Sequence, residues 1–324
     1  MAETAPALVL CVPSKGRLQE NAHAFFARAG LDVVQARGAR DYRGRLAQVP
    51  GVEIAFLSAS EIVTQLAAGT AHLGVTGEDL VRESVADADA KLALLTPLGF
   101  GYANVVVAVP QAWIDVATMA DLEDVASAYH ARRGERMRVA TKYVNLTRRY
   151  FAQAGVSDYR IVESLGATEG APAAGQAELI VDITTTGTTL QANALKILDD
   201  GVILRSQANL VAALRAPWTP QAREAARIIL SRIAAEELAR TTREVEALDM
   251  PKDVAAIEHA GKHYEAQLLA QSDQTMTFSV PSAKAAALAD DLVGKGAARV
   301  TIRAHQAVFS THNPLADALF RHLA

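Results

Sequence analysis

The stretch ELIVDITTTGTTLQANALKIL, residues 178–198, says more about the fold than any other part of the sequence. Its apolar run over residues 179–181 ends at Asp182, and five threonines then surround Gly187. The run has the length and composition of a buried strand, and helical spacing of apolar residues resumes from about Thr189. The stretch therefore predicts a strand, a polar turn and a helix, which together form the repeating unit of an α/β fold.

The polar turn has the composition of a phosphate-binding loop. Backbone N–H groups at a helix start and threonine hydroxyls donate hydrogen bonds to anions, and Gly187 permits close approach or a positive φ. Asp182, at the strand end, is well placed for sugar hydroxyls or a magnesium ion. A capped strand-to-helix turn has the same composition, so the residues alone leave both interpretations open. The sequence contains neither the Walker motif nor the dinucleotide motif GxGxxG.

Composition restricts the class of protein and the kinds of partner. Of 324 residues, 50% are hydrophobic and 21% are charged, and the net charge is -4. This balance argues against a broad basic face for nucleic acid. The N-terminal region lacks the pattern of a signal peptide, and no apolar run reaches the roughly 18 residues needed to cross a bilayer. We therefore expect a cytoplasmic protein without nucleic-acid or membrane partners, and a buried position for its single cysteine, Cys11.

Apolar runs alternate with amphipathic segments along the first two thirds of the chain, which predicts an α/β protein with largely parallel strands. Gly30 and Gly69 fit the ends of two helices, and Ser60 fits the N-cap of the second. A polar helical segment after Pro110 indicates a change of domain. Strands are expected at residues 7–12, 51–57, 71–76, 103–109, 137–140, 159–163, 178–183 and 202–214.

The sequence changes in character after Pro217. Residues 221–248 are rich in alanine, arginine and glutamate and have helical spacing. A β-α-β pattern follows from residue 275 to residue 309. These features predict a separate small α+β domain. The segments TREVEAL and DVAAIEHA fit either the first half of that domain or a continuation of the long helix.

Residues 163–198 resemble the signature region of the ATP phosphoribosyltransferases of histidine biosynthesis. In that family a glutamate is followed six residues on by a glycine, then by an apolar strand ending in aspartate and by the motif [ST]-G-x-T-L. The matching positions here are Glu169, Gly175, Asp182 and residues 186–190. The resemblance extends to PSKGRL at 13–18, GVTGEDL at 74–80 and VATKYVNLTRRYFAQAG at 139–155, and so covers most of residues 7–214.

The resemblance implies an α/β fold with a two-lobed catalytic region like a type II periplasmic binding protein, and a small C-terminal ferredoxin-like α+β domain. We expect lobe I at residues 1–109 and 195–218, lobe II at 110–194, and a regulatory or oligomerising domain at 219–324. The implied reaction transfers the phosphoribosyl group of phosphoribosyl pyrophosphate to N1 of ATP with inversion. This is the first step of histidine biosynthesis. Histidine as inhibitor and assembly into a homo-oligomer, a dimer or hexamer, are implied as well.

The same resemblance assigns the candidate substrate-binding residues in lobe II. The loop that would take the 5-phosphate consists of Thr185, Thr186, Gly187, Thr188 and Thr189. Glu169 and Asp182 would hold the ribose hydroxyls, and Asp182 would also lie near the Mg²⁺ that accompanies the pyrophosphate. We assign no acid or base, because N1 of adenine is nucleophilic without one.

Further candidates come from other segments of the chain, and each has a structural alternative. Lys15 and Arg17 would supply charge to the polyanionic substrates, as would Arg40 at a position where an arginine is usual in the family. An isolated arginine is often only a solvated surface charge. Tyr143 would line the adenine side or pack in the core. Glu78 and Asp79 would lie at the cleft or serve as acidic residues of a helix start.

Two positions depart from the family pattern, since Leu57 and Glu61 stand where relatives commonly carry an arginine and an aspartate. Two other functions also remain open. A nucleobase phosphoribosyltransferase would share an acidic strand followed by TGxT, and a non-catalytic two-lobed binding protein would share the fold. The companion motifs PSKGRL and ATKY favour the ATP phosphoribosyltransferase.

Overall fold

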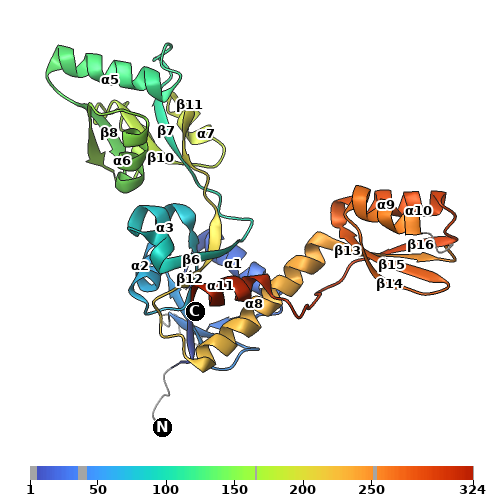
Figure 1. Cartoon of the computed structure of the whole chain (residues 1–324). Coiled ribbons are helices and arrows are strands. Elements are labelled where there is room, and N and C mark those ends of the chain that lie inside the picture. The colour runs from blue at the N-terminus through green and yellow to red at the C-terminus, as the bar shows by residue number, and fades with distance from the viewer. Residues whose placement is uncertain (1–5, 36–41, 165, 251–253, 324) are drawn as a thin grey trace, which may run out of the picture.

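A computed structural model of the chain describes residues 6–35, 42–164, 166–250 and 254–323. It contains two lobes and a C-terminal domain, each built on its own sheet (Figure 1). Arg40 lies outside the described residues. No helix within the described ranges is long and apolar enough to span a membrane.

Lobe I is built on a seven-stranded sheet, sheet A, in the order β2-β3-β4-β1-β5-β12-β6. β1 runs parallel to β4 and β5, whereas β12 runs antiparallel to β5 and β6. The residues that follow β1, β4 and β5 therefore meet at one edge of the sheet. The strands are β1 Leu8–Pro13, β2 Val33–Gln35, β3 Arg43–Leu46, β4 Val52–Leu57, β5 Leu73–Gly77, β6 Leu92–Pro97 and β12 Ala208–Ala213.

The helices of lobe I are α1 Gly16–Arg28, α2 Ala59–Ala68, α3 Glu78–Ser84 and α4 Ala88–Lys91. α2 ends at Gly69, with φ 73°, as the sequence predicts. Its N-cap is Ser58 and not Ser60, because Ser58 and Glu61 form a reciprocal capping box. Cys11 is 1% exposed in the core, which confirms its predicted position.

Lobe II is built on a five-stranded sheet, sheet B, in the order β11-β7-β10-β8-β9. α5 and α6 cover one face, where the core includes Met119, Leu122, Leu146 and Phe151. The strands are β7 Asn104–Pro110, β8 Met137–Thr141, β9 Tyr159–Glu163, β10 Leu179–Thr184 and β11 Leu195–Leu204. The helices are α5 Met119–Arg133, α6 Val144–Gln153, the short 3-10 helix η1 Thr168–Gly170, and α7 Thr188–Ala192.

The boundary between the lobes differs from the sequence-based division. β7 and β11 were expected in lobe I, yet both pair within sheet B. The chain therefore crosses between the lobes at residues 98–103 and 205–207. The predicted strand at 202–214 is two strands in different sheets, because an apolar run reveals burial and not the sheet it joins.

The segment after the threonine loop also differs from its prediction. Helical spacing was expected to continue through residue 198, but α7 has only five residues. Ala194 has φ 54°, a conformation that cannot continue a right-handed helix, and β11 begins at Leu195. The apolar residues 195–198 therefore belong to a strand of sheet B.

The C-terminal domain has a four-stranded antiparallel sheet, sheet C, in the order β14-β15-β13-β16. Its element order is βαββαβ, and both helices pack on one face of the sheet (Figure 1). TREVEAL is the first strand and not the end of the preceding helix. The elements are β13 Thr242–Leu248, α9 Val254–Tyr264, β14 Gln267–Gln271, β15 Thr275–Pro281, η2 Ser282–Lys284, α10 Ala285–Gly294 and β16 Arg299–Arg303.

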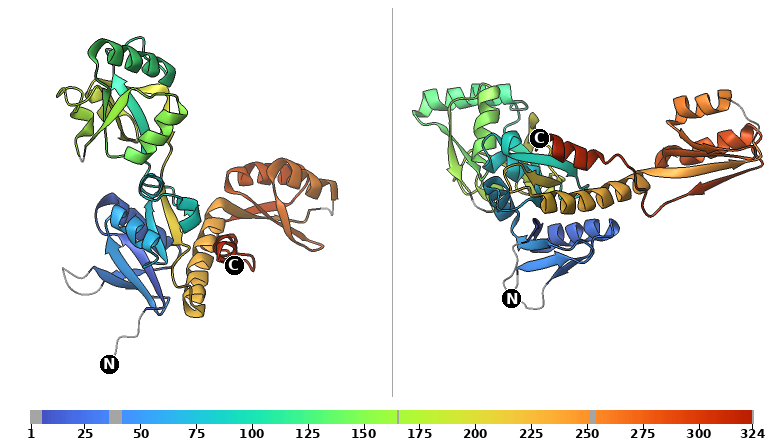
Figure 2. Two further views of the ribbon diagram at one scale, coloured as in Figure 1. Left: turned by 60° about the vertical axis from the view of Figure 1, so that its left-hand side comes forward. Right: turned by 60° about the horizontal axis from the view of Figure 1, so that its bottom comes forward.

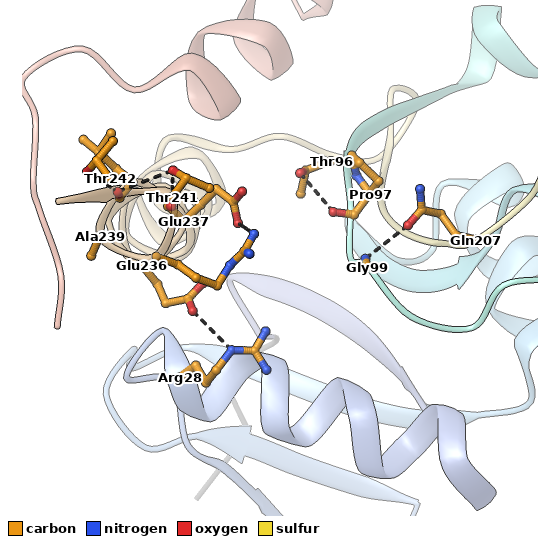
Figure 3. A network of polar contacts seen from close by, with 12 residues as sticks. Arg28, Thr96, Pro97, Gly99, Gln207, Glu236, Glu237, Ala239, Thr241 and Thr242 are labelled. Carbon is orange, nitrogen blue, oxygen red and sulfur yellow. Dashed lines mark hydrogen bonds and ion pairs between the residues drawn. The ribbon is translucent and has the colours of Figure 1, made fainter. Parts of the chain in front are cut away.

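Two helices that the sequence assigned to the C-terminal domain pack on lobe I. α8, Pro220–Thr241, places Ala226, Ile229 and Leu230 in the core beneath sheet A, and α11, Pro314–His322, adds Leu319. Arg28 of α1 forms an ion pair with Glu236 of α8, with Nε and Oε1 3.1 Å apart (Figure 3). Figure 2 shows α8 running from lobe I to sheet C, so both ends of the sheet C domain are joined to lobe I.

Candidate active site

The carboxyl edge of the parallel strands in sheet A carries a cavity of about 460 Å³. Lys15 lies there because it follows β1 and is the N-cap residue of α1. Leu57 and Ser58 reach the same cavity from the end of β4, and Tyr42 and Glu61 complete the lining with Ser14 and Phe56. Arg17 is exposed on the first turn of α1 and is not among the lining residues.

Glu61, one of the two departures from the family pattern, has a structural role at this edge. Its Oε2 accepts hydrogen bonds from the Ser58 backbone N–H at 2.9 Å and from the Ser58 hydroxyl at 2.6 Å. These bonds, with a smaller contribution from the charge of Lys15, lower the pKa of Glu61 below its usual range. Glu61 is therefore a charged helix cap that stands beside Lys15.

The threonine loop after β10 is a tight turn held by its own side chains. Thr184 Oγ1 accepts a hydrogen bond from the Gly187 N–H at 2.8 Å, and Gly187 has φ 77°, so glycine suits this position. The Thr186 and Thr188 hydroxyl oxygens are 2.8 Å apart. Thr185 Oγ1 donates to the carbonyl of Tyr102 at 2.9 Å, which fixes the loop to the first crossing between the lobes.

This loop borders a second cavity, of about 400 Å³, on lobe II. Two carboxylates line it, Glu169 in η1 and Asp182 on β10, and the exposed ring of Tyr102 forms part of its rim. The other lining residues are Ala103, Ile183, Thr184, Thr185, Thr186, Thr189 and Leu190. The predicted loop and both predicted carboxylates thus lie around one polar cavity.

Asp182 lies in a mixed electrostatic environment. Burial raises its pKa above the usual range, and the negative charge of Glu169 acts in the same direction. The hydrogen bond from the Ile183 N–H, at 2.8 Å, and the charge of Lys142 oppose that rise. A half-buried carboxylate with a second carboxylate nearby is suited to bind hydroxyl groups or a hard cation.

The chemistry of these two carboxylates fits a shared magnesium ion. Among the described residues, no three His, Cys, Asp or Glu side chains cluster to hold a metal on their own. Magnesium commonly binds one or two protein carboxylates together with substrate phosphates. Asp182 and Glu169 would therefore hold Mg²⁺ only in combination with phosphate oxygens of a substrate.

Asp79 and Tyr143 are not among the lining residues of either cavity. Tyr143 is 1% exposed and Asp79 is 5% exposed. The Tyr143 hydroxyl donates to Asp79 Oδ2 at 2.8 Å, and Ser206 Oγ donates to Asp79 Oδ1 at 2.9 Å. Burial, together with the charge of Asp79, raises the pKa of Tyr143 far above its usual value, so its hydroxyl remains a donor. Glu78, the neighbour of Asp79, accepts a hydrogen bond from Arg82 at 3.3 Å.

Sequence reasoning missed two residues near the lobe II cavity. Lys142 is exposed at the end of β8, influences the pKa of Asp182, and has its Nζ 5.1 Å from the centroid of the Tyr143 ring. Tyr102 lies in the crossing segment and is 54% exposed. For Lys142, the available signal was its position directly after a predicted parallel strand. Tyr102 had none, because its position depends on the crossing between sheets.

Comparisons with known proteins show the family to which the chain belongs. The sequence model of the ATP phosphoribosyltransferase family matches residues 58–235. The ATP phosphoribosyltransferase of Nitrobacter winogradskyi is 59% identical over 315 residues, covering 96% of this chain and 97% of that protein. The protein of the same name from Bradyrhizobium diazoefficiens is 58% identical and covers 95% of each chain.

A solved structure is similar over most of this chain. It is titled as the ATP phosphoribosyl transferase (HisG:HisZ) complex from Thermotoga maritima, and it matches with a TM-score of 0.53 and 27% identity. The match covers 70% of this chain and 95% of that one. From the family match, the near full-length similarity and this shared fold, we conclude that the chain belongs to the ATP phosphoribosyltransferase family, which catalyses the first step of histidine biosynthesis.

Proposed function

We propose that phosphoribosyl transfer takes place in the cleft between lobes I and II, with phosphoribosyl pyrophosphate held first by lobe II. The observation that carries this proposal is the cavity lined by the threonine loop, Glu169 and Asp182. Donors for a phosphate and acceptors for sugar hydroxyls lie side by side in it. That arrangement matches a ribose that carries a 5-phosphate.

In this proposal the loop of residues 185–189 binds the 5-phosphate through hydroxyls and backbone N–H groups. Because α7 is short, these direct hydrogen bonds and not a helix dipole supply most of the attraction. Glu169 and Asp182 accept hydrogen bonds from the ribose hydroxyls and fix the sugar. Lys142 supplies positive charge on the lobe II side of the cleft, and Lys15 supplies it on the lobe I side. Arg17 lies close to Lys15 in the sequence.

The reaction then depends on orientation more than on proton transfer. N1 of adenine attacks C1 of the ribose from the face opposite the departing pyrophosphate, and positive charge develops on the sugar. The carboxylates of Glu169 and Asp182 lie where they stabilise that charge. When bound, Mg²⁺ offsets the charge of the leaving pyrophosphate. The exposed ring of Tyr102, at the rim of the cavity, offers a stacking surface for adenine.

The experiment measures release of pyrophosphate from ATP, phosphoribosyl pyrophosphate and magnesium. Thr186→Val should raise the KM for phosphoribosyl pyrophosphate about tenfold or more, because a charged hydrogen bond contributes roughly 1.5 to 3 kcal/mol. Thr241→Val, which removes a threonine hydroxyl on α8, is the matched control. Equal kinetics in the two variants would reject the loop as the phosphate site.

We further propose that the sheet C domain binds histidine as a feedback inhibitor and contributes to a homo-oligomer. The βαββαβ topology supports this, since it is the arrangement that the resemblance assigns to the regulatory domain. Turnover should fall when histidine is added, and sedimentation should show an assembly larger than one chain. Turnover that does not respond to histidine would remove the regulatory role and leave assembly as the function of this domain.

A further inference from the structure

A third cavity, of about 240 Å³, lies where the sheet C domain is attached to lobe I. Its walls include Thr241 of α8 and Thr96 of β6 (Figure 3). The return segment, residues 304–313, leads from sheet C into α11 and contributes a further wall. Within it, the Val308 N–H donates to the carbonyl of Ala235 on α8 at 2.9 Å. The cavity therefore lies between lobe I and both connections to the sheet C domain, α8 and the return segment.

The lining of this cavity is mainly apolar. Two of its hydroxyls already donate to carbonyls of their own elements, Thr241 to Glu237 at 2.7 Å and Thr96 to Pro97 at 3.3 Å. An engineered apolar cavity of about 150 Å³ binds benzene, so this one has room for a six-membered ring with a short substituent. The large apolar residues of the lining include Phe25, Ile233, Leu238, Val308 and Leu315.

Asn313, the N-cap residue of α11, brings an unpaired donor to the wall of this cavity. Its Oδ1 accepts from the backbone N–H groups of Leu315 and Ala316, at 3.2 Å and 3.1 Å, which fixes the orientation of the amide. Its Nδ2 is buried and has no hydrogen-bond partner among the described residues. Because an unsatisfied buried donor is costly, an acceptor oxygen on a molecule in the cavity would be bound favourably there.

The titratable side chains of the described lining, Glu237 and His312, already have partners. Glu237 Oε2 lies 2.5 Å from Arg240 Nη2, and His312 Nδ1 lies 2.8 Å from Asp317 Oδ2. Histidine, nucleotides and phosphorylated sugars carry full charges, which would lose their hydration in this cavity without a free counter-charge. The cavity also shares no described lining residue with the two cavities on the lobes. It is therefore suited to a neutral ligand and is separate from the proposed substrate site.

We propose that this cavity is a binding site for a small neutral molecule that combines an apolar ring with one carbonyl oxygen, and that this oxygen accepts a hydrogen bond from Asn313. The bound molecule contacts α8 and the return segment together, and these are the two connections between lobe I and the sheet C domain. It therefore holds both connections against lobe I. The proposal does not depend on where phosphoribosyl pyrophosphate binds.

The first test titrates the full chain, with labelled Ile, Leu and Val methyl groups, with acetophenone in methyl-detected NMR. Saturable shift changes are expected at Ile233, Leu238, Val308 and Leu315, which line the cavity. α-Methylstyrene has the shape of acetophenone but a methylene group in place of the carbonyl oxygen. It should bind about fivefold more weakly, because one hydrogen bond is lost. No saturable shift at these methyl groups, or equal dissociation constants for the two probes, would overturn the proposal.

The second test removes the donor. Asn313→Asp keeps an oxygen for the N-cap of α11 but loses the amide N–H, so the fivefold preference for acetophenone should disappear. Asn21→Asp, at an exposed position of α1, is the matched control and should keep the preference. A preference retained in Asn313→Asp would contradict the proposal. If that variant does not fold, Ala234→Leu, which fills the cavity from α8, should abolish saturable binding of both probes, and binding that persists would count against the site.

The third test addresses the two connections and the class of ligand. Amide hydrogen exchange over residues 304–313 should slow when acetophenone is saturating, and unchanged exchange would mean that the ligand does not hold the return segment. Saturating histidine should leave the dissociation constant of acetophenone unchanged. Displacement of acetophenone by histidine would overturn the assignment of the cavity to neutral molecules.

Discussion

The two sides of the cleft are built differently. The lobe II side is a preformed polar cavity, in which Thr184 and Thr185 fix the loop and both Asp182 and Glu169 belong to the lining. The lobe I side presents one exposed lysine, Lys15, beside the capping carboxylate of Glu61. The comparison teaches that, in the proposed function, a preformed cavity would recognise the sugar and 5-phosphate, whereas an exposed side chain would recognise the pyrophosphate.

The largest effect should come from the lobe II side. Asp182→Asn keeps the shape of the side chain but removes its charge, and we expect kcat/KM to fall about 100-fold, since both sugar orientation and charge stabilisation are lost. Asp199→Asn, on an exposed position of β11, is the control and should leave kcat/KM unchanged. Steady-state kinetics with both substrates would measure the change in kcat/KM. A fall in kcat/KM of less than threefold for Asp182→Asn would contradict a sugar-binding role.

Removing the positive charge of one exposed lysine, on either side of the cleft, should have a smaller effect. Lys15→Ala and Lys142→Ala should each raise the KM for phosphoribosyl pyrophosphate about tenfold at low salt, and the difference from wild type should shrink as salt is added. Lys262→Ala, an exposed lysine in the sheet C domain, controls for the change in net charge. If Lys262→Ala matches the two cleft variants, the effect is nonspecific.

Glu61→Gln removes a negative charge from the lobe I side of the cleft, whereas the lysine variants remove positive charges. Removing a negative charge beside Lys15 should strengthen inhibition by pyrophosphate about twofold, while ribose 5-phosphate binding at lobe II stays the same. Product-inhibition constants for pyrophosphate would measure the change. Equal inhibition in both proteins would mean that Lys15 does not contact pyrophosphate.

The smallest effect concerns the scaffold of lobe I. His72 is 4% exposed, accepts a hydrogen bond from the Val9 N–H and lies 3.3 Å from the Pro217 carbonyl. Burial lowers its pKa below the usual value, so the folded state binds a proton less readily than the unfolded chain. Stability should therefore decrease as pH falls below about 6.5.

Thermal unfolding at pH 5 and pH 7.5 would measure this dependence. His72→Gln should unfold at lower temperature than wild type at pH 7.5 but lose less stability on acidification. The exposed His322→Gln should keep the wild-type dependence. Identical pH profiles for His72→Gln and wild type would exclude His72 as the source.

The sequence predicted most of the strongly apolar strands of the two lobes, although it missed β6, and it named candidate site residues that follow the predicted strands directly. Strands β1, β4, β5, β8, β9 and β10 lie within a few residues of their predicted ranges. The edge strand β2 and its neighbour β3 were missed because they bury little, with Val34, Arg43 and Arg45 exposed. An edge strand lacks the hydrophobic pattern by which strands are recognised.

The sequence did not predict contacts between residues that are far apart along the chain. Tyr143 and Asp79 are 64 positions apart, and only the crossing of the chain between two sheets brings them together. The long helix was predicted, but its end at Thr241 was not, because the strand that follows alternates charged and small apolar residues over Glu244, Val245, Glu246 and Ala247. One face of this strand is polar, and there Arg303 donates hydrogen bonds to Glu244 and Glu246.

The return of α11 to lobe I has a consequence for how the chain tolerates truncation. The sheet C domain is inserted into lobe I and does not hang from its end, since the chain leaves through α8 and comes back to bury Ala316 and Leu319 against the same core. A chain cut after residue 303 would lose the return connection to lobe I and would also expose apolar surface on that lobe. Removing the sheet C domain cleanly therefore requires an internal deletion that rejoins α8 to α11.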